Sequence, residues 1–220
     1  MWLPESASTI GPQVDRLFWA ILWITGAFFF LVQGCLLAFV LLYKSRPGKK
    51  AQYLHGNTAV EVVWTIVPAL ILGGLTIASQ KAWVDIRNPK IPVTVPQQKV
   101  EILAEQFAWN VRYPGPDGQF GSQDDVTTIN QLHLPVGQPT LVQLKSKDVI
   151  HSFFVPEFRV KQDAVPGLTT HIWVTPTKVG EYEIRCAELC GLGHYRMRGF
   201  VTTQTPLQFQ QWLAETKTNE

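Results

Sequence analysis

The sequence predicts a two-helix transmembrane hairpin followed by an all-β domain, either a sandwich or a small barrel. Hydrophobic residues make up 46% of the chain, and much of this apolar surplus lies before Ser79 in two long runs. The rest of the chain alternates short β-type runs with turn residues, as a β domain does. The net charge of +2 gives no indication of nucleic-acid binding.

The first apolar run extends from Phe18 to Tyr43 and contains no formal charge. It is longer than the about 20 residues that a helix needs to cross a bilayer, so residues 18–43 are predicted to be the first transmembrane helix. A signal peptide fits this sequence less well, because its apolar region is shorter than this run and its leading segment is basic, whereas the segment here carries more acids than bases. Residues 1–17 are therefore expected to form an external N-terminal segment.

The second apolar run extends from Ala59 to Ser79 and holds one charge, Glu61, near its start. Its internal proline and glycines are tolerated in membrane helices. Residues 59–80 are predicted to be the second transmembrane helix, antiparallel to the first.

The connection between the two spans, residues 44–58, is basic and contains no acid. An excess of lysine and arginine in a short loop places that loop in the cytoplasm. The N-terminus and residues 81–220 are then expected on the outer side. This side is the periplasm of a bacterial inner membrane, or the intermembrane space in a mitochondrial equivalent.

Residues 81–97 are expected to be a proline-rich linker, and residues 98–205 the β domain. The predicted strands lie in the runs KVEILAEQFAWNVRY, TLVQLKS, DVIHSFFV, TTHIWVT, GEYEIRC and MRGFVTT. In THIWVT, alternation predicts that Ile172 and Val174 are buried. Residues 206–220 form the C-terminal helix and tail, because Thr205 and Gln208 have the spacing of a capping box with proline between them.

Two cysteines, a histidine and a methionine lie within the segment from Cys186 to Met197. A disulfide between Cys186 and Cys190 is one interpretation, because the outer compartment is oxidising. Zinc is a weaker interpretation, since the sequence lacks the matching second ligand pair typical of structural zinc. Thiolate, imidazole and thioether ligands together favour copper.

A copper site needs a second imidazole, and the run DVIHSFFV supplies it as His151. A mononuclear blue site uses one thiolate, whereas this chain offers two. Two thiolates can bridge two ions, with His151 and His194 each completing one ion and with Met197 and a backbone carbonyl in weak axial positions. Sharing the electron over both ions suits electron transfer rather than substrate chemistry.

The pattern C-x-E-x-C-G-x-x-H-x-x-M, with the upstream segments HSF–VP and KQDAVPG, resembles subunit 2 of the haem–copper cytochrome oxidases. The resemblance covers nearly the whole chain. It implies a cupredoxin-like β domain that carries CuA, a centre of two copper ions. The ligands that it implies are His151, Cys186, Cys190, His194 and Met197 by their side chains and Glu188 by its backbone carbonyl.

The resemblance implies further roles. The Glu188 carboxylate is expected to bind a magnesium or manganese ion shared with subunit 1. Glu61 corresponds to a glutamate at the entrance of a proton channel; the alternative is an acid that merely reaches the membrane interface. Phe107 and Trp109 correspond to the aromatic segment through which electrons enter. Here the sequence departs from the family, which commonly has tryptophan at the first position and another aromatic in place of Ala108. The alternative is that Phe107 and Trp109 share one strand face and belong to the core.

The implied function is electron transfer within cytochrome c oxidase, an oxidoreductase. Electrons from cytochrome c or a similar external donor reach CuA and pass to the haems of subunit 1, where oxygen is reduced to water and protons are pumped. The expected partners are subunit 1 with its haems and CuB, subunit 3, the donor and the lipid bilayer. The alternatives are a CuA-type subunit of a nitric oxide reductase and an exported structural or copper-handling module.

Arg185 precedes Cys186, where a neutral side chain is common in the family. A fixed cation beside the centre favours its reduced form by Coulomb attraction. We therefore expect Arg185→Gln to lower the reduction potential of the copper centre, measured by spectroelectrochemical titration of the full-length protein. An unchanged potential would contradict this expectation.

Overall fold

The computed structural model describes residues 3–51, 53–89, 91–92, 95 and 97–218. The remaining positions of the expected external segment, loop, linker and tail lie outside the described residues. The chain divides into two compact units. One comprises Gln13–Trp83, and the other joins Met1–Pro12 to Val84–Glu220.

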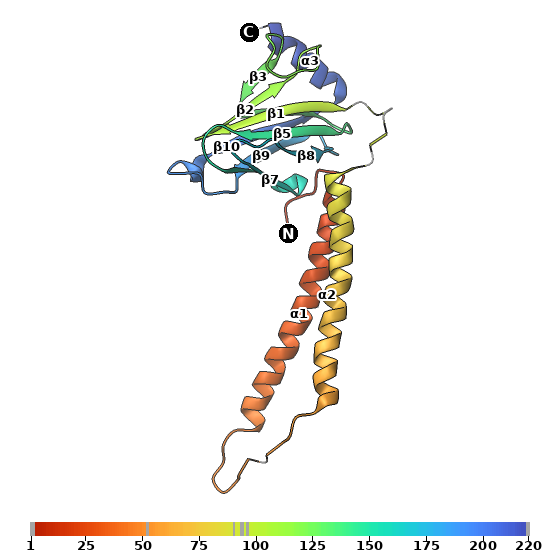
Figure 1. The fold of residues 1–220 in the computed structure, drawn as a ribbon, viewed down its shortest axis with the longest axis vertical. Coiled ribbons are helices and arrows are strands. Elements are labelled where there is room, and N and C mark those ends of the chain that lie inside the picture. The colour runs from red at the N-terminus through yellow and green to blue at the C-terminus, as the bar shows by residue number, and fades with distance from the viewer. Residues whose placement is uncertain (1–2, 52, 90, 93–94, 96, 219–220) are drawn as a thin grey trace. The chain divides into compact units, whose positions relative to one another are not determined.

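Two helices, α1 (Gly11–Leu42) and α2 (Thr58–Arg87), are long and apolar enough to cross a membrane (Figure 1). α1 begins before the predicted run and ends at Leu42, whereas α2 extends beyond its predicted run at both ends, because polar residues continue these helices. The side chain of Asn57 caps α2, since its Oδ1 accepts hydrogen bonds from the N–H groups of Ala59 and Val60 at 3.1 and 3.2 Å. The structure thus contains the two long apolar helices that the sequence predicted.

The β domain consists of two five-stranded sheets. The first has the order β3–β2–β1–β5–β8, formed by β1 (Gln98–Glu105), β2 (Ala108–Tyr113), β3 (Val126–Ile129), β5 (Thr140–Ser146) and β8 (Thr170–Val174). The second has the order β4–β10–β9–β6–β7, formed by β4 (Gln131–Pro135), β6 (His151–Val155), β7 (Val160–Ala164), β9 (Gly180–Cys186) and β10 (Arg198–Gln204). β1 runs parallel to β5, and β10 runs parallel to β4.

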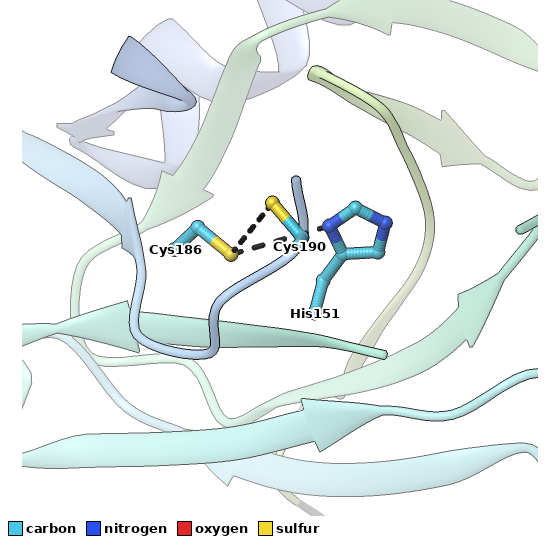
Figure 2. Close-up of side chains that lie close together, drawn as sticks. All are labelled: His151, Cys186 and Cys190. Carbon is cyan, nitrogen blue, oxygen red and sulfur yellow. Dashed lines mark hydrogen bonds between the residues drawn. The ribbon is translucent and has the colours of Figure 1, made fainter. Parts of the chain in front are cut away.

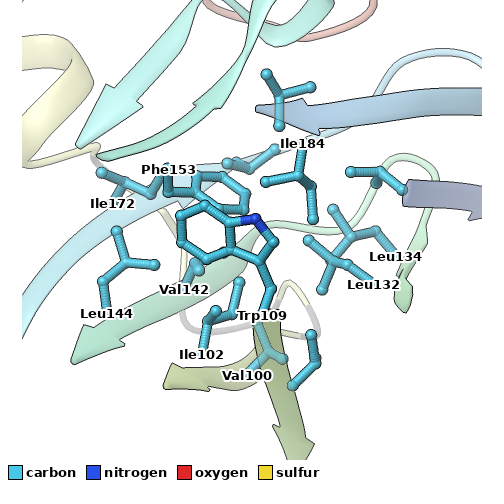
Figure 3. Packing of buried hydrophobic residues seen from close by; sticks show 14 of the residues in the cluster. Val100, Ile102, Trp109, Leu132, Leu134, Val142, Leu144, Phe153, Ile172 and Ile184 are labelled. Carbon is cyan, nitrogen blue, oxygen red and sulfur yellow. The ribbon is translucent and has the colours of Figure 1, made fainter. Parts of the chain in front are cut away.

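The inner faces of the two sheets form the core of the sandwich. Figure 3 shows the Trp109 indole among aliphatic side chains of its own sheet and beside Phe153 and Ile184 of the opposite sheet. All three residues are buried. In β8, Ile172 and Val174 are buried while His171 is exposed, so the alternation read from THIWVT is confirmed. The predicted β-sandwich fold is therefore correct.

One predicted strand is in fact a hairpin. The run KVEILAEQFAWNVRY forms β1 and β2, which pair antiparallel up to Glu105 and Ala108 and leave Gln106 and Phe107 as the turn. The interpretation that Phe107 and Trp109 share one strand face is wrong, because the chain reverses before Trp109. Trp109 lies in the core, whereas Phe107 lies at the end of the sandwich and is only partly buried.

The segment formed by residues 4–9, here called the N-terminal strap, binds to the β domain. The Ala7 N–H donates to the Glu157 carbonyl at 2.8 Å, and the Thr177 N–H donates to the Ala7 carbonyl at 2.9 Å. The hydroxyl of Ser8 donates to the Phe158 carbonyl at 2.7 Å. Ala7 and Ser8 are buried, so the strap is an integral part of this unit.

The C-terminal helix α3 (Pro206–Thr218) begins with the predicted capping box. The Gln208 N–H donates to Thr205 Oγ1 at 3.3 Å, and Gln208 Oε1 accepts from the Thr205 N–H at 3.1 Å. Phe209 enters the core, and Trp212 stacks on His133 of β4 with ring centroids 3.8 Å apart. Capping and aromatic contacts together hold α3 on the sandwich.

We expect Thr205→Ala to lower the free energy of unfolding of the β domain by about 1 kcal/mol. The substitution removes the Thr205 hydroxyl and so leaves the backbone N–H of Gln208 without its acceptor. Urea unfolding of the full-length protein, followed by tryptophan fluorescence, measures this change. The exposed Thr169→Ala is the matched control. Equal stability of the two variants would contradict the capping role.

Candidate metal centre

Three neighbouring strands bring the predicted ligands together at one end of the sandwich. β6 pairs with β9 so that Phe153 lies opposite Cys186, and His151 stands two residues before Phe153 on β6. β9 and β10 pair antiparallel, with Arg185 opposite Arg198. The segment that leaves β9 at Cys186 must therefore return at Met197, directly before β10. This segment, residues 186–197, is here called the ligand loop.

The donor atoms lie within a few ångströms of one another. Figure 2 shows the side chains of His151, Cys186 and Cys190 turned toward one another. Cys186 Sγ lies 4.0 Å from His151 Nδ1, and the two sulfur atoms lie 3.8 Å apart. Cys190 Sγ lies 3.6 Å from His194 Nδ1 and 3.6 Å from Met197 Sδ. Each cysteine therefore has a histidine of its own.

The two cysteines are free thiols in this structure. Their Sγ–Sγ distance of 3.8 Å is well beyond the about 2.05 Å of a disulfide bond. The sulfur atoms face the imidazole nitrogens and the thioether instead. This arrangement favours a metal site over the disulfide that the sequence left open.

The donor separations fit a bound transition metal. Bonds of about 2.3 Å to sulfur and 2.0 Å to nitrogen place the donors of a four-coordinate ion roughly 3.5–3.8 Å apart. The four separations given above lie between 3.6 and 4.0 Å. The carbonyl oxygen of Glu188 lies 3.2 Å from Cys186 Sγ and adds a hard donor at the edge. Two thiols, two imidazoles and a thioether are a soft set, which selects copper.

The centre is buried on one side and open on the other. His151, Cys190 and Met197 are buried, while Cys186 and His194 are partly exposed. Burial, followed by the neighbouring Cys186, raises the pKa of the Cys190 thiol to about 11. Two thiolates so close together would repel each other, and a bound cation would relieve that repulsion.

An acid that the sequence interpretation missed orients His151. Asp148 Oδ1 lies 2.8 Å from His151 Nε2, and Asp148 Oδ2 accepts the N–H of Gln106 at 2.7 Å. Burial alone would raise the pKa of Asp148, but hydrogen bonds from His151 and from backbone N–H groups outweigh it and lower the pKa. The carboxylate accepts a hydrogen bond from the Nε2–H group of His151, so the Nδ1 lone pair points to Cys186, as in carboxylate–histidine–metal triads. The signal was the spacing of three residues between Asp148 and His151.

The aromatic residues singled out in the sequence lie beside the centre. The Trp109 ring meets the His151 ring edge to face, with centroids 6.2 Å apart. The Phe107 ring lies against the backbone of the ligand loop, since a Cβ on Gly193 would come within 2.5 Å of Phe107 Cδ2. Glu188 is exposed on the loop, whereas Glu61 lies in the first turn of α2 in the other compact unit.

Arg185 is not an isolated cation. Its Nη2 lies 3.0 Å from Glu183 Oε2, two residues earlier on the same face of β9. This acid offsets part of the charge beside Cys186 and supplies the matched control for Arg185→Gln. Glu183→Gln removes the opposite charge, so it is expected to shift the reduction potential in the opposite direction.

A soft, partly buried donor set at the end of a cupredoxin-like sandwich, joined to two apolar helices, defines a membrane-anchored copper protein. Residues 1–81 match the family model for the transmembrane domain of cytochrome c oxidase subunit II, and residues 106–203 match that for its periplasmic domain. The chain belongs to the cytochrome c oxidase subunit II family. It is therefore anchored in a membrane with its β domain in the periplasm.

Two cytochrome c oxidase subunit 2 proteins support this assignment along nearly the whole chain. The alternative cytochrome c oxidase subunit 2 of Bradyrhizobium diazoefficiens is 34% identical, over 99% of this chain and 84% of the relative. Cytochrome c oxidase subunit 2 of Thermostichus vulcanus is 34% identical, over 96% and 77% respectively. The solved periplasmic domain of cytochrome oxidase subunit II from Bradyrhizobium japonicum is 28% identical and covers 57% of this chain and 99% of its own, with a TM-score of 0.49.

Proposed function

We propose that this chain is the electron-transfer subunit of a respiratory haem–copper oxidase and that its metal centre is a binuclear CuA site. The observation that carries the proposal is the paired arrangement of two thiols 3.8 Å apart, each beside its own imidazole. Two copper ions held by these cysteines and histidines would supply a one-electron carrier. Oxygen reduction and proton pumping then belong to subunit 1, and the chain's own residues serve to hold and shield the carrier.

The ligand roles divide between the two sides of the centre. His151 and Cys186 come from neighbouring strands, and Asp148 holds a proton on the outer nitrogen of His151 so that the inner nitrogen can bind metal. Cys190, His194 and Met197 come from the ligand loop and its short helix. Burial of His151, Cys190 and Met197 excludes water from one side. A metal site shielded from water changes its geometry little on reduction, and rapid electron transfer requires this.

Electrons would reach the centre from cytochrome c or a similar periplasmic donor. Phe107 is partly exposed and touches the ligand loop, whereas Trp109 is buried against His151. This difference supports Phe107 as the surface contact and Trp109 as an inner neighbour of the centre. Glu188 would contribute its carbonyl to copper and its exposed carboxylate to a magnesium or manganese ion shared with subunit 1. Glu61 would lie at the entrance of a proton channel.

The N-terminal strap supports the predicted orientation in the membrane. Residues 4–9 hydrogen-bond to the β domain, so both must lie on one side of the bilayer. Two crossings satisfy this requirement, and the basic loop between them would be cytoplasmic. In this orientation the N-terminus and the β domain face the periplasm of an inner membrane. Subunit 1 and subunit 3 would be the partners within that membrane.

The oxygen-reducing partner is favoured over a nitric oxide reductase because both family matches are to cytochrome c oxidase. A purely structural exported module is disfavoured because it would not need thioether, imidazole and thiol groups in one cluster. The family matches therefore favour the oxidase over the reductase, and the donor geometry favours a metal centre over a purely structural module.

We expect the purified full-length protein to bind two copper ions per chain. Its electron paramagnetic resonance spectrum should show one unpaired electron coupled to both nuclei, as a bridged mixed-valence pair requires. Metal analysis and the spectrum measure this together, with Cys35→Ser as a control that should change neither. One copper with a simple four-line pattern, or no copper and a Cys186–Cys190 disulfide, would contradict the proposal.

We expect a cysteine placed at position 5 to react with a membrane-impermeant maleimide in spheroplasts, because the strap lies on the periplasmic side. Glu5→Cys and Lys49→Cys provide the pair to compare in a Cys35→Ser background, since both positions are exposed in the structure. Labelling of the Cys35→Ser parent, which keeps Cys186 and Cys190, is the baseline to subtract. Position 49 should react only after the membrane is permeabilised. Labelling of position 49 in intact spheroplasts would refute the orientation.

A further inference from the structure

The turn between β1 and β2 contacts both parts of the metal centre. The side chain of Gln106 donates from Nε2 to the Cys190 carbonyl at 2.5 Å, and its backbone N–H donates to Asp148 Oδ2 at 2.7 Å. Asp148 in turn holds His151 through Nε2 at 2.8 Å. A single residue, which offers no metal ligand itself, therefore links the histidine on β6 to the cysteine on the ligand loop.

The same turn shapes the ligand loop through its glycines. A Cβ on Gly191 would lie 2.6 Å from Gln106 Nε2, and a Cβ on Gly193 would lie 2.5 Å from Phe107 Cδ2. Gly191 also has a φ of +130°, which side chains other than glycine rarely adopt. The sequence C-G-L-G-H thus leaves room for the turn on both sides of Leu192, and that leucine points outward and is 97% exposed.

The loop needs such an attachment because its middle has no regular structure. Residues 187–193 belong to no helix or strand. The loop is anchored at its start, where the Ala187 N–H donates to the Ser152 carbonyl at 3.0 Å, and it closes before Met197. Between these ends, the carbonyl of Cys190 is held by Gln106. Without this bond, only the burial of Cys190, the packing of Phe107 and the bonds within the loop would keep Cys190 beside Cys186.

We propose that Gln106 is a positioning residue for the metal centre and that the β1–β2 turn clamps the ligand loop to the His151 segment before metal binds. The inference rests on the proposed function, since it assumes that the centre takes up copper. Its physical basis is preorganisation: a loop already held in the bound arrangement loses less conformational freedom when the ligands close on the metal. Substitutions of outer partners of metal ligands typically lower metal affinity 10–100-fold.

Gln106→Met tests the clamp in the full-length protein, because methionine keeps the length of the side chain and removes the donor. We expect copper release to an excess of a chelator to become at least about 10-fold faster than in the unchanged protein. The copper hyperfine pattern in the electron paramagnetic resonance spectrum should also change, since Cys190 loses its fixed position. In urea unfolding, the metal-free protein should lose less stability from this substitution than the copper form does.

Gln119→Met is the matched control. Gln119 is an exposed residue of the loop that follows β2, at the far end of that strand from the turn. It should leave both release and spectrum unchanged. A Gln106→Met variant with unchanged release and spectrum would overturn the inference, and so would one whose metal-free form is destabilised as much as its copper form, because that marks a general structural role. If the unchanged protein binds no copper, the proposed function fails first and the inference with it.

Discussion

The register of β6, β9 and β10 is the constraint on which the metal centre depends. Phe153 pairs with Cys186, and Arg185 pairs with Arg198, so the first histidine and first cysteine meet at one end of the sheet while the chain from Cys186 must return at Met197. A slip of one residue would turn a strand's side chains to the opposite face of the sheet. The buried Phe153 and Ile184 oppose such a slip, because it would expose them. Core burial and ligand geometry are thus fixed by the same pairing.

The surroundings of the centre balance opposite requirements. Burial protects the soft ligands but disfavours charged thiolates, as the raised pKa of Cys190 indicates. A bound metal cation would resolve this conflict, and the lowered pKa of Asp148 keeps its carboxylate ionised, so that it accepts the hydrogen bond from Nε2 of His151. Arg185 adds positive charge at the rim, where Glu183 moderates it. The centre is therefore tuned by partners that are not ligands.

Much of the fold could be predicted from the sequence, and the elements that were not predicted were missed for identifiable physical reasons. The apolar runs, the alternation in β8 and the capping box of α3 are local patterns, so they predict local structure well. The strand β7 was missed because its exposed residues, such as Lys161 and Asp163, do not look like a β run. The β1–β2 turn was missed because Gln106 and Phe107 carry none of the usual turn residues, and its form depends on Cys190, far along the chain.

Among the candidate site residues, the sequence motif supplied the five side chains that the structure gathers into one cluster. It could not supply Gln106 as a supporting residue, because its role arises from contacts between β-strand ends that no local pattern records. Asp148 was overlooked although its spacing of three residues from His151 is local. It also could not show that Phe107 and Trp109 lie on different sides of a turn. Motifs identify donor atoms, whereas the support around them is a property of the folded domain.

The N-terminal strap has a consequence for how the protein is made. Residues 4–9 are synthesised before both helices, whereas the groups that they bind, near Glu157, Phe158 and Thr177, are synthesised after them. The β domain can therefore be completed only after both helices have crossed and the remaining chain has reached the same side. A chain inserted with a single crossing would leave Ala7 and Ser8 on the wrong face of the bilayer. The complete domain can therefore form only when the membrane insertion has placed both segments on the same side of the bilayer.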